Sequence, residues 1–318
     1  MARDKIVVVC GPTASGKTSL AIEIAKRCNA EIVSADSMQI YKEMNIGTAK
    51  PDLKEQQGIP HYMINVASVS EQYNVSRYVK EAIECIEKIL AKGKNVIVVG
   101  GTGLYIDSLI NNINFFEIEN DFDYRKYLGQ LAEKNGNGFV HDMLSTVDKS
   151  AADRLHPNDL KRVIRALEVY KVTGKTISQI QSDSIRQRRY EPVFIGLDYE
   201  DRSVLYSRIE KRVEQMIQDG LEQEARGLLN LKLSETASAA IGYKEMFEYI
   251  RQETTLEQAV CSICQRTRNY AKRQLTWFRK NSEINWFYPP KYQYNVQKIT
   301  DDVCSIVDLK ENNNEAEI

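Results

Sequence analysis

The sequence has no apolar run of about 18 residues, the length that a membrane-spanning helix requires. It also begins without the ordered basic, apolar and small-residue segments of a secretory signal, because the apolar run before Gly11 is short and typical of a strand. The formal net charge is only −1 over 318 residues, so the chain as a whole is not a polycation. We therefore expect a cytoplasmic protein with no membrane segment, in which any nucleic-acid binding comes from local basic patches.

Cysteine is scarce as well, with six residues scattered along the chain. Cys261 and Cys264 form a C-x-x-C pair, but no second pair of Cys or His follows at the spacing of a zinc site. We expect reduced thiols that serve as small apolar residues.

The stretch CGPTASGKTSL, residues 10–20, has the form G-x-x-x-x-G-K-[ST] of a phosphate-binding loop. In such a loop the glycines let the backbone wrap the phosphates, and the following helix directs its positive end toward them. Lys17 supplies a point charge, and the Thr18 hydroxyl is placed to bind Mg²⁺. The pattern predicts phosphate binding but does not identify the rest of the ligand. The predicted loop residues are Gly11, Pro12, Thr13, Ala14, Ser15, Gly16, Lys17 and Thr18.

Strand and helix patterns alternate along the first third of the chain. Apolar runs at 5–9, 30–36 and 95–103 predict buried parallel strands, and the apolar spacing in 76–94 predicts an amphipathic helix. This βαβ spacing predicts an α/β fold of the P-loop NTPase-like type, with a parallel sheet flanked by helices.

The pattern becomes purely helical from about residue 114 to 189, and its clearest helix lies in 156–175. A strand pattern returns at 191–199, followed by two long helical patterns at about 202–231 and 255–280. We interpret 114–189 as an all-helical insertion domain within an α/β core. That core is predicted to comprise 1–113 and 190–306, and the polar, acidic residues 307–318 are expected to form a disordered tail.

The predicted strands differ in whether an acidic residue follows them. The strand at 95–103 ends in VIVVGGTG, without the carboxylate that holds Mg²⁺ and organises water in ATPases. Asp36 instead follows the strand at 30–36, at the edge of the sheet where open α/β proteins bind ligands. At this point three roles stay open for Asp36: a metal ligand of a kinase, a general base that activates an acceptor, or a cap of the next turn.

Segment 264–280 carries six Lys and Arg residues, no acidic residue, and interleaved aromatic side chains. This composition is typical of a nucleic-acid-binding face, although an ordinary solvated helix with its aromatics toward the core would also show it. Two further basic clusters, 161–165 and 186–190, lie in the predicted insertion or at its edge. Three such clusters favour a polyanion larger than a nucleotide.

Six stretches together resemble one family, the bacterial tRNA dimethylallyltransferases, also called tRNA isopentenyltransferases. Their order matches that of the family from residue 5 to about 287, so the resemblance spans nearly the whole chain. The stretches are GPTASGKT (11–18), SADSMQIYKEMNIGTAKP (34–51), VVGGTGLY (98–105), LHPNDLKRVIRALEVYKVTGK (155–175), AIGYKE (240–245) and AKRQLTWFR (271–279).

The resemblance implies that the loop holds the diphosphate of dimethylallyl diphosphate, with Mg²⁺ on Thr18. The dimethylallyl group would pass to N6 of the adenosine directly 3′ of the anticodon, in tRNAs that read codons beginning with U. Asp36 would accept the amine proton, Thr102 and Gln39 would hold the adenine, and the base would flip out of the anticodon stack. Arg165 would contact the diphosphate or the nearby tRNA backbone.

The resemblance thus implies Asp36, Thr18 and Thr102 as catalytic residues and an anticodon stem-loop as the macromolecular partner. The residues that it implies in tRNA binding are Asp36, Ser37, Met38, Gln39, Thr102, Arg125, Lys161, Arg162, Val163, Ile164, Arg165, Gly242, Tyr243, Lys244, Lys272, Arg273, Gln274, Trp277 and Arg279.

Residues 111–123 depart from the proline-containing pattern that the family usually shows before the position of Arg125. Three rival activities remain open. An isopentenyltransferase acting on free adenine nucleotides would have little use for the insertion or for 264–280. A P-loop nucleotide kinase would consume ATP, and an RNA-binding protein with a nucleotide switch would bind a nucleotide without prenyl chemistry. We expect a monomeric enzyme.

Overall fold

The computed structural model describes residues 3–113, 120–184 and 187–307. The predicted tail lies outside these residues apart from Val307, as does the segment 114–119 at the start of the predicted insertion. The chain divides into two compact units, residues 1–110 with 188–318 and residues 111–187. Each unit is described separately below, as the α/β unit and the helical unit.

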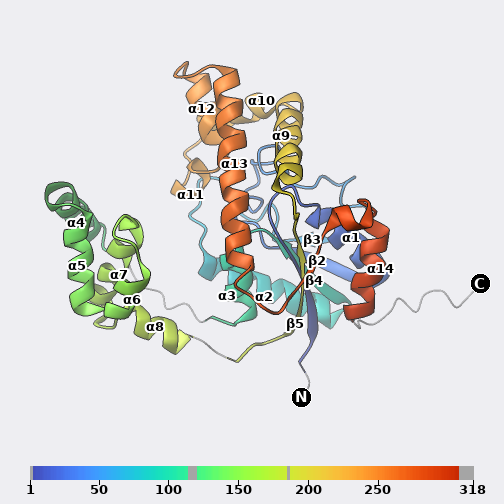
Figure 1. The fold of residues 1–318 in the computed structure, drawn as a ribbon, viewed down its shortest axis with the longest axis horizontal. Coiled ribbons are helices and arrows are strands. Elements are labelled where there is room, and N and C mark those ends of the chain that lie inside the picture. The colour runs from blue at the N-terminus through green and yellow to red at the C-terminus, as the bar shows by residue number, and fades with distance from the viewer. Residues whose placement is uncertain (1–2, 114–119, 185–186, 308–318) are drawn as a thin grey trace, which may run out of the picture. The chain divides into compact units, whose positions relative to one another are not determined.

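A six-stranded parallel sheet forms the centre of the α/β unit (Figure 1). The strands lie in the order β3-β2-β4-β1-β5-β6, so that β1 is central and pairs with β4 and β5. Because the strands are parallel, the segments that follow β1, β2 and β4 emerge at the same edge. The strands are β1 (Lys5–Cys10), β2 (Ala30–Ser34), β3 (His61–Tyr62), β4 (Asn95–Gly100), β5 (Glu191–Leu197) and β6 (Ile284–Phe287).

Both faces of this sheet are buried, which explains why its central strands are apolar throughout rather than alternating. Val7 and Val9 join the core cluster that includes α1 and α14, while Val8, whose side chain points to the opposite face, is equally inaccessible. The helices of this unit are α1 (Lys17–Arg27), α2 (Val75–Ala91), α3 (Gly103–Ile110), α9 (Arg202–Gln218), α10 (Leu221–Leu229), α11 (Glu235–Ser238), α12 (Tyr243–Ile250), α13 (Leu256–Phe278), η1 (Pro289–Tyr292, a 3₁₀ turn) and α14 (Val296–Val307).

The structure differs from the sequence-based expectation in two respects. Strands β3 and β6 are not predicted, because two and four residues are too few to show a pattern. The predicted helix at 202–231 is two helices, since Gly220 adopts a φ of 99° between α9 and α10 and ends the first of them. Among the described residues, no helix combines the length and apolarity that crossing a membrane requires.

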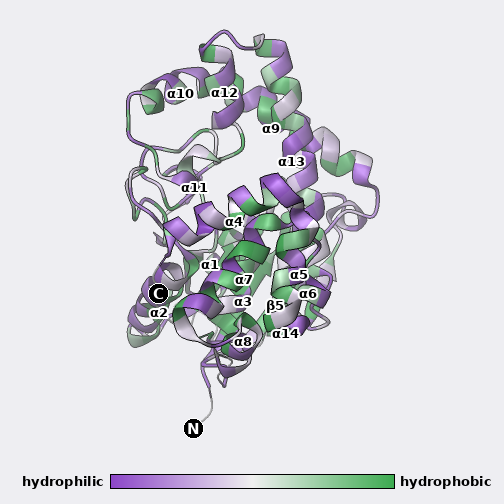
Figure 2. Ribbon diagram, turned by 90° about the vertical axis from the view of Figure 1, so that its left-hand side faces the viewer, coloured by the Kyte–Doolittle hydropathy of each residue, from purple (hydrophilic) through white to green (hydrophobic). Residues whose placement is uncertain are grey.

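The helical unit surrounds a small core of its own. Leu128, Val140, Leu144 and Val163 are fully buried there, and Figure 2 shows hydrophobic and hydrophilic residues side by side along its helices. The chain enters and leaves through neighbouring segments, because the Asn112 side chain donates a hydrogen bond to the Gln187 carbonyl (3.2 Å). The helices are α4 (Phe122–Asn135), α5 (Asn137–Val147), α6 (Lys149–Arg154), α7 (Leu160–Thr173) and α8 (Ile177–Ser184).

Candidate active site

The phosphate-binding loop joins β1 to α1, as the motif predicts. Its backbone reaches positive φ at Gly11 (139°), Ala14 (61°) and Gly16 (94°). A side chain at position 11 would place its Cβ 2.5 Å from the Leu197 carbonyl oxygen, so only glycine fits beside β5. Gly16 begins α1 without a capping side chain, which leaves the positive end of the helix open to an anionic ligand.

A cavity of about 70 Å³ lies at the edge of the sheet where the loop emerges. It brings together Lys17, Thr18 and Asp36, which the sequence predicts for one site. Asp36 is the one carboxylate among the described residues that line it. The lining residues are Thr13, Lys17, Thr18, Ser34, Asp36, Gln39, Thr48, Pro51, His61, Val99, Gly100, Gly101, Arg212, Tyr270 and Gln274.

Asp36 is held by the turn that follows it. Its Oδ1 accepts hydrogen bonds from the backbone N–H groups of Met38 (2.9 Å) and Gln39 (3.3 Å). Its Oδ2 has no hydrogen-bond partner among the described residues and stays available to a ligand. Asp36 therefore caps the turn, one of the three roles left open by the sequence, and its second carboxylate oxygen leaves the roles of base and metal ligand open.

Thr102 fixes the segment next to Asp36. Its Oγ1 accepts a hydrogen bond from the Ser37 backbone N–H (3.0 Å), and its own N–H bonds to the Ala35 carbonyl (3.1 Å). The Tyr270 hydroxyl shares hydrogen bonds with Thr102 and Gln274, and burial together with the negative charge of Asp36 raises the pKa of Tyr270 to about 12. Tyr270 is thus a neutral phenol beside the carboxylate.

Gln274, predicted as a tRNA contact, binds two segments of the site itself. Its Oε1 accepts from the Thr13 N–H (2.8 Å), and its Nε2 donates to the Gly101 carbonyl (2.9 Å). The side chain is 5% exposed. With these two hydrogen bonds, Gln274 holds the phosphate loop against the turn between β4 and α3.

Two arginines that the sequence analysis missed lie against the loop. Arg208 donates from Nε to the Ala14 carbonyl (2.8 Å), and Arg212 lies 3.4 Å from the Thr13 hydroxyl. They are four residues apart and so share one face of α9. The sequence around these two arginines contains no motif that would identify them, because their role depends on α9 packing near a loop about 200 residues earlier in the chain.

The two arginines and Lys17 make the surroundings of the loop strongly cationic. Burial and, to a lesser extent, the Arg212 guanidinium lower the pKa of Lys17 to about 8, while the negative charge of Asp36 acts in the opposite direction. Arg208, Lys211 and Arg212 also line a second cavity of about 750 Å³, which shares Lys17 and Thr18 with the first. So many cations around one loop favour a multiply charged anion as the ligand.

His61 is another residue that the sequence did not single out. Its Nδ1 donates to the Ile59 carbonyl (2.8 Å), and burial lowers the pKa of the ring. The ring is therefore neutral at pH 7, with Nε2 as an acceptor. That Nε2 is buried without a hydrogen-bond partner among the described residues, and His61 lines the cavity with Asp36.

The basic segment of α13 divides into paired and unpaired cations. Arg266, Arg268 and Arg279 form ion pairs with carboxylates. Lys272 and Arg273 lie over the rings of Tyr206 and Tyr270 and have no carboxylate partner among the described residues. These two are the cations of the segment best placed to meet a polyanion.

Val163 and Tyr243 are predicted tRNA contacts with inaccessible side chains, so a contact at either position would have to use the backbone. Val163 belongs to the core of the helical unit. The Tyr243 hydroxyl donates to Glu224 (2.6 Å) and accepts from the Gly47 N–H (3.1 Å).

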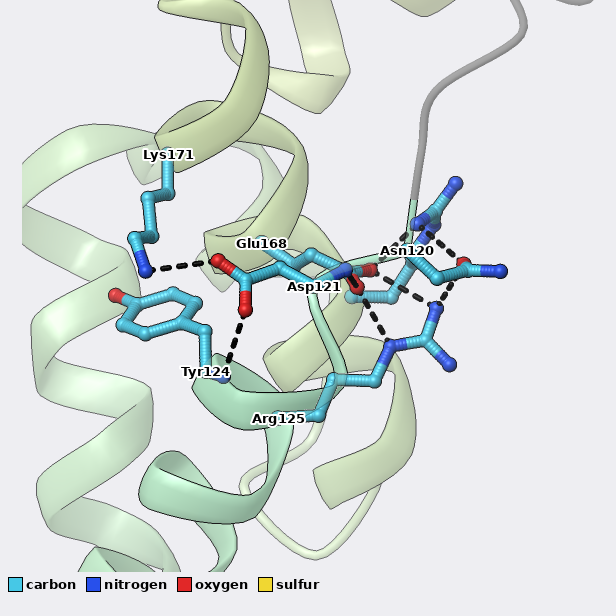
Figure 3. Close-up of polar contacts among 7 residues, drawn as sticks. Asn120, Asp121, Tyr124, Arg125, Glu168 and Lys171 are labelled. Atoms are coloured by element: carbon cyan, nitrogen blue, oxygen red, sulfur yellow. Dashed lines mark hydrogen bonds and ion pairs between the residues drawn. The ribbon is translucent and has the colours of Figure 1, made fainter.

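In the helical unit, Arg125 and Arg165 both pair with one buried carboxylate, that of Glu168. Figure 3 shows Arg125 beside Glu168. Glu168 accepts hydrogen bonds from Arg125 (2.7 and 2.9 Å) and from Arg165 (2.5 Å). Burial alone would raise the pKa of Glu168, but these bonds outweigh it and lower the pKa. The cluster keeps one net positive charge and a partly exposed guanidinium on each arginine.

The remaining predicted contacts are distributed over both units. In the α/β unit, Gly242 begins α12 and Lys244 is exposed. In the helical unit, Lys161 and Arg162 are exposed in the first turn of α7, and Ile164 packs against the core. Their contacts with tRNA stay predictions.

Comparisons with known proteins identify relatives of this chain. A model of the IPP transferase family matches residues 39–281. The chain is 49% identical over 286 residues to the tRNA dimethylallyltransferase of Acetivibrio thermocellus, which covers 89% of this chain and 91% of the relative. It is 46% identical over 293 residues to the tRNA dimethylallyltransferase of Thermoanaerobacter sp. (strain X514), covering 91% and 93%.

Two solved structures share the fold. The full-length tRNA isopentenylpyrophosphate transferase of Bacillus halodurans matches with a TM-score of 0.71 and 39% identity, covering 96% of this chain and 97% of that one. A eukaryotic dimethylallyltransferase acting on tRNA matches with a TM-score of 0.79 and 30% identity, covering 97% and 81%. These matches and the observed sheet confirm the predicted P-loop NTPase-like α/β fold.

Proposed function

Since this chain belongs to the IPP transferase family, we propose that it is a tRNA dimethylallyltransferase that modifies N6 of the adenosine 3′-adjacent to the anticodon. The donor in this proposal is dimethylallyl diphosphate, and the tRNAs are those that read codons beginning with U. One observation carries the proposal: a phosphate-binding loop and a single carboxylate, Asp36, line the same cavity. A free-nucleotide acceptor and a kinase reaction are not favoured by the relatives.

The phosphate side of the site suits a diphosphate leaving group. As the allylic C–O bond breaks, negative charge grows on the diphosphate, and cations fixed beforehand stabilise it without reorganising. Lys17, Arg208 and Arg212 meet that requirement, since each is already oriented by a hydrogen bond or polar contact with the loop.

The donor set also fits Mg²⁺. Thr18 supplies a hydroxyl oxygen in the cavity, and this cation needs only one or two protein oxygens when substrate phosphates and waters complete its shell. Thr18 would hold it, and when bound it would neutralise charge on the diphosphate. Among the described residues, no cluster of three or more His, Cys, Asp or Glu side chains forms an all-protein metal cage.

The acceptor side requires a base for one proton. The adenine amine attacks the allylic carbon as the C–O bond to the diphosphate breaks, and Asp36 Oδ2 accepts the proton that the new N–C bond displaces. Thr102 and Gln39 adjoin Asp36 and are proposed to hold the adenine, which must leave the anticodon stack to reach the cavity.

We further propose that basic residues of α13 and of the helical unit bind the anticodon stem-loop, with the protein acting as a cytoplasmic monomer. The cations available for the RNA backbone include Lys272 and Arg273 on α13 and Arg125 and Arg165 over Glu168.

The test uses radiolabelled dimethylallyl diphosphate with Mg²⁺, offered with tRNA from a modification-deficient bacterium and, separately, with AMP. Label entering tRNA alone supports the proposal. Label entering AMP alone would overturn the tRNA assignment but keep the donor site, and ATP consumption without label transfer would identify a kinase.

A further inference from the structure

Trp277 lies on the face of α13 that also carries Tyr270 and Gln274, at helical spacings of four and three residues. This face runs along the turn between β4 and α3. Tyr270 shares a hydrogen bond with Thr102, and Gln274 donates a hydrogen bond to Gly101. The Trp277 ring, next along the face, packs on Gly103. Trp277 is therefore the last residue of a row that begins at the proposed adenine site.

The indole ring is held from two sides. Its Nε1 donates a 2.6 Å hydrogen bond to Asp107. At Gly103, an added Cβ would lie 2.4 to 2.7 Å from three atoms of the ring, so the ring packs directly on the backbone there. Burial raises the pKa of Asp107, and the hydrogen bond from Trp277 acts in the opposite direction.

A tryptophan that served only the core would bury its ring, but Trp277 is 37% exposed. Leu104, the residue after Gly103, is 46% exposed. The neighbouring unpaired cations Lys272 and Arg273 lie on the same helix, within a turn and a half of Trp277. A rigid, partly exposed aromatic ring with cations nearby is the arrangement that proteins use to stack an unpaired base.

We propose that Trp277 is a stacking surface for an unpaired base that neighbours the target adenosine, with Asp107 and Gly103 as its positioning residues. The inference rests on the proposed function and adds a second base site to it. The seven residues from Tyr270 to Trp277 span about 10 Å of helix. A nucleotide adjoining the target can reach across this distance because loop bases splay apart when proteins bind them.

The chain offers a direct probe, since Trp286 is its other tryptophan. In a W286F background the fluorescence reports Trp277 alone, and the ligand is an anticodon stem-loop RNA that contains the unmodified adenosine. Stacking predicts strong quenching that saturates with binding. W277L should bind this RNA on the order of 10- to 100-fold more weakly, whereas W277F should keep much of the affinity because it keeps a ring.

An abasic nucleotide on either side of the target distinguishes stacking from proximity. At the stacked position it should abolish the quenching and make the affinities of the W286F protein and the W286F/W277L protein equal. Unaltered fluorescence on an RNA that binds and is prenylated would overturn the stacking proposal alone. Failure of the wild-type protein to bind or prenylate this RNA would overturn the proposed function as well, and circular dichroism of W286F, W277L and W277F checks that all three remain folded.

Discussion

The backbone N–H of Thr13 donates a 2.8 Å hydrogen bond to the side chain of Gln274, 261 residues later in the chain. The same side chain bonds to Gly101. The phosphate loop is thus held by the helix that also carries Tyr270 and Trp277, and the donor and acceptor sides of the cavity share one support.

Gln274→Leu should loosen the phosphate loop. Two buried hydrogen bonds disappear, each with a net value of about 1 kcal/mol, and the Thr13 N–H and Gly101 carbonyl lose their partner. We expect KM for dimethylallyl diphosphate to rise roughly tenfold, with a smaller change in tRNA affinity. Steady-state kinetics with each substrate varied in turn measure this. Gln265→Leu, at an exposed position of α13, is the matched control, and an effect on tRNA affinity alone would contradict the positioning role.

Asp36→Asn should abolish proton acceptance but keep the turn. The amide oxygen can still accept from Met38 and Gln39, so the backbone geometry is retained. Loss of a general base predicts a decrease in kcat of about 10² to 10⁴-fold with nearly unchanged tRNA binding. Single-turnover transfer and filter binding measure the two quantities, and an equal loss of both would remove Asp36 from the role of base.

Arg212→Ala should weaken stabilisation of the leaving group. We expect kcat/KM for the diphosphate donor to fall on the order of 10²-fold, and inorganic diphosphate to become a weaker inhibitor. Arg202→Ala, at the exposed start of α9, controls for loss of charge on the same helix. If both variants lose activity equally, the loss comes from removing positive charge from α9 in general rather than from the contact between Arg212 and Thr13.

Arg165→Ala should change how tRNA binding depends on salt. If this guanidinium contacts a phosphate, the slope of log K against log salt becomes shallower by about 1 unit. Binding measured between 50 and 200 mM salt, roughly the range over which such slopes are read, gives this slope. Lys134→Ala in the last turn of α4 is the control. A weaker affinity with an unchanged slope would show that Arg165 serves only to hold Glu168.

Glu31 gives the α/β unit a measurable dependence on pH. Burial alone would raise its pKa, but hydrogen bonds from Lys94, Lys92 and Tyr62 outweigh that and lower the pKa to about 2. The folded-state pKa thus lies below its ordinary value of 4.5, so this stability is complete above that value and is lost as the pH falls towards 2.

The Glu31→Gln variant should lose about 1–2 kcal/mol of unfolding free energy at pH 7, after a discount for the partly exposed lysines. Urea unfolding can be followed by tryptophan fluorescence, because Trp277 and Trp286 both lie in this unit. The difference between wild type and variant should shrink on acidification, and parallel curves would refute the linkage.

The central fold is predictable because its signals are local. The strands β1, β2 and β4 are continuous apolar runs that end in a phosphate motif, an acidic residue and a glycine turn. Strands β3 and β6 escape prediction because only their pairing with β2 and β5 identifies them.

The residues of the candidate site also fall into those that the local sequence predicts and those that only tertiary contacts identify. Lys17, Thr18 and Asp36 follow from motif and position, whereas Arg212 and His61 enter through contacts between distant segments. At Tyr243 the family stretch predicts a tRNA contact, whereas the hydrogen bond between its hydroxyl and the Gly47 N–H could not be read from the sequence.

The hydrogen bond between Asn112 and Gln187 brings the two ends of the helical unit next to each other. Strands β4 and β5 flank this segment in sequence. A segment inserted in this way can be exchanged, lengthened or shortened without changing the strand order of the sheet. Changes in the length or sequence of the helical unit could therefore accumulate without disturbing the phosphate loop or Asp36, which belong to the α/β unit.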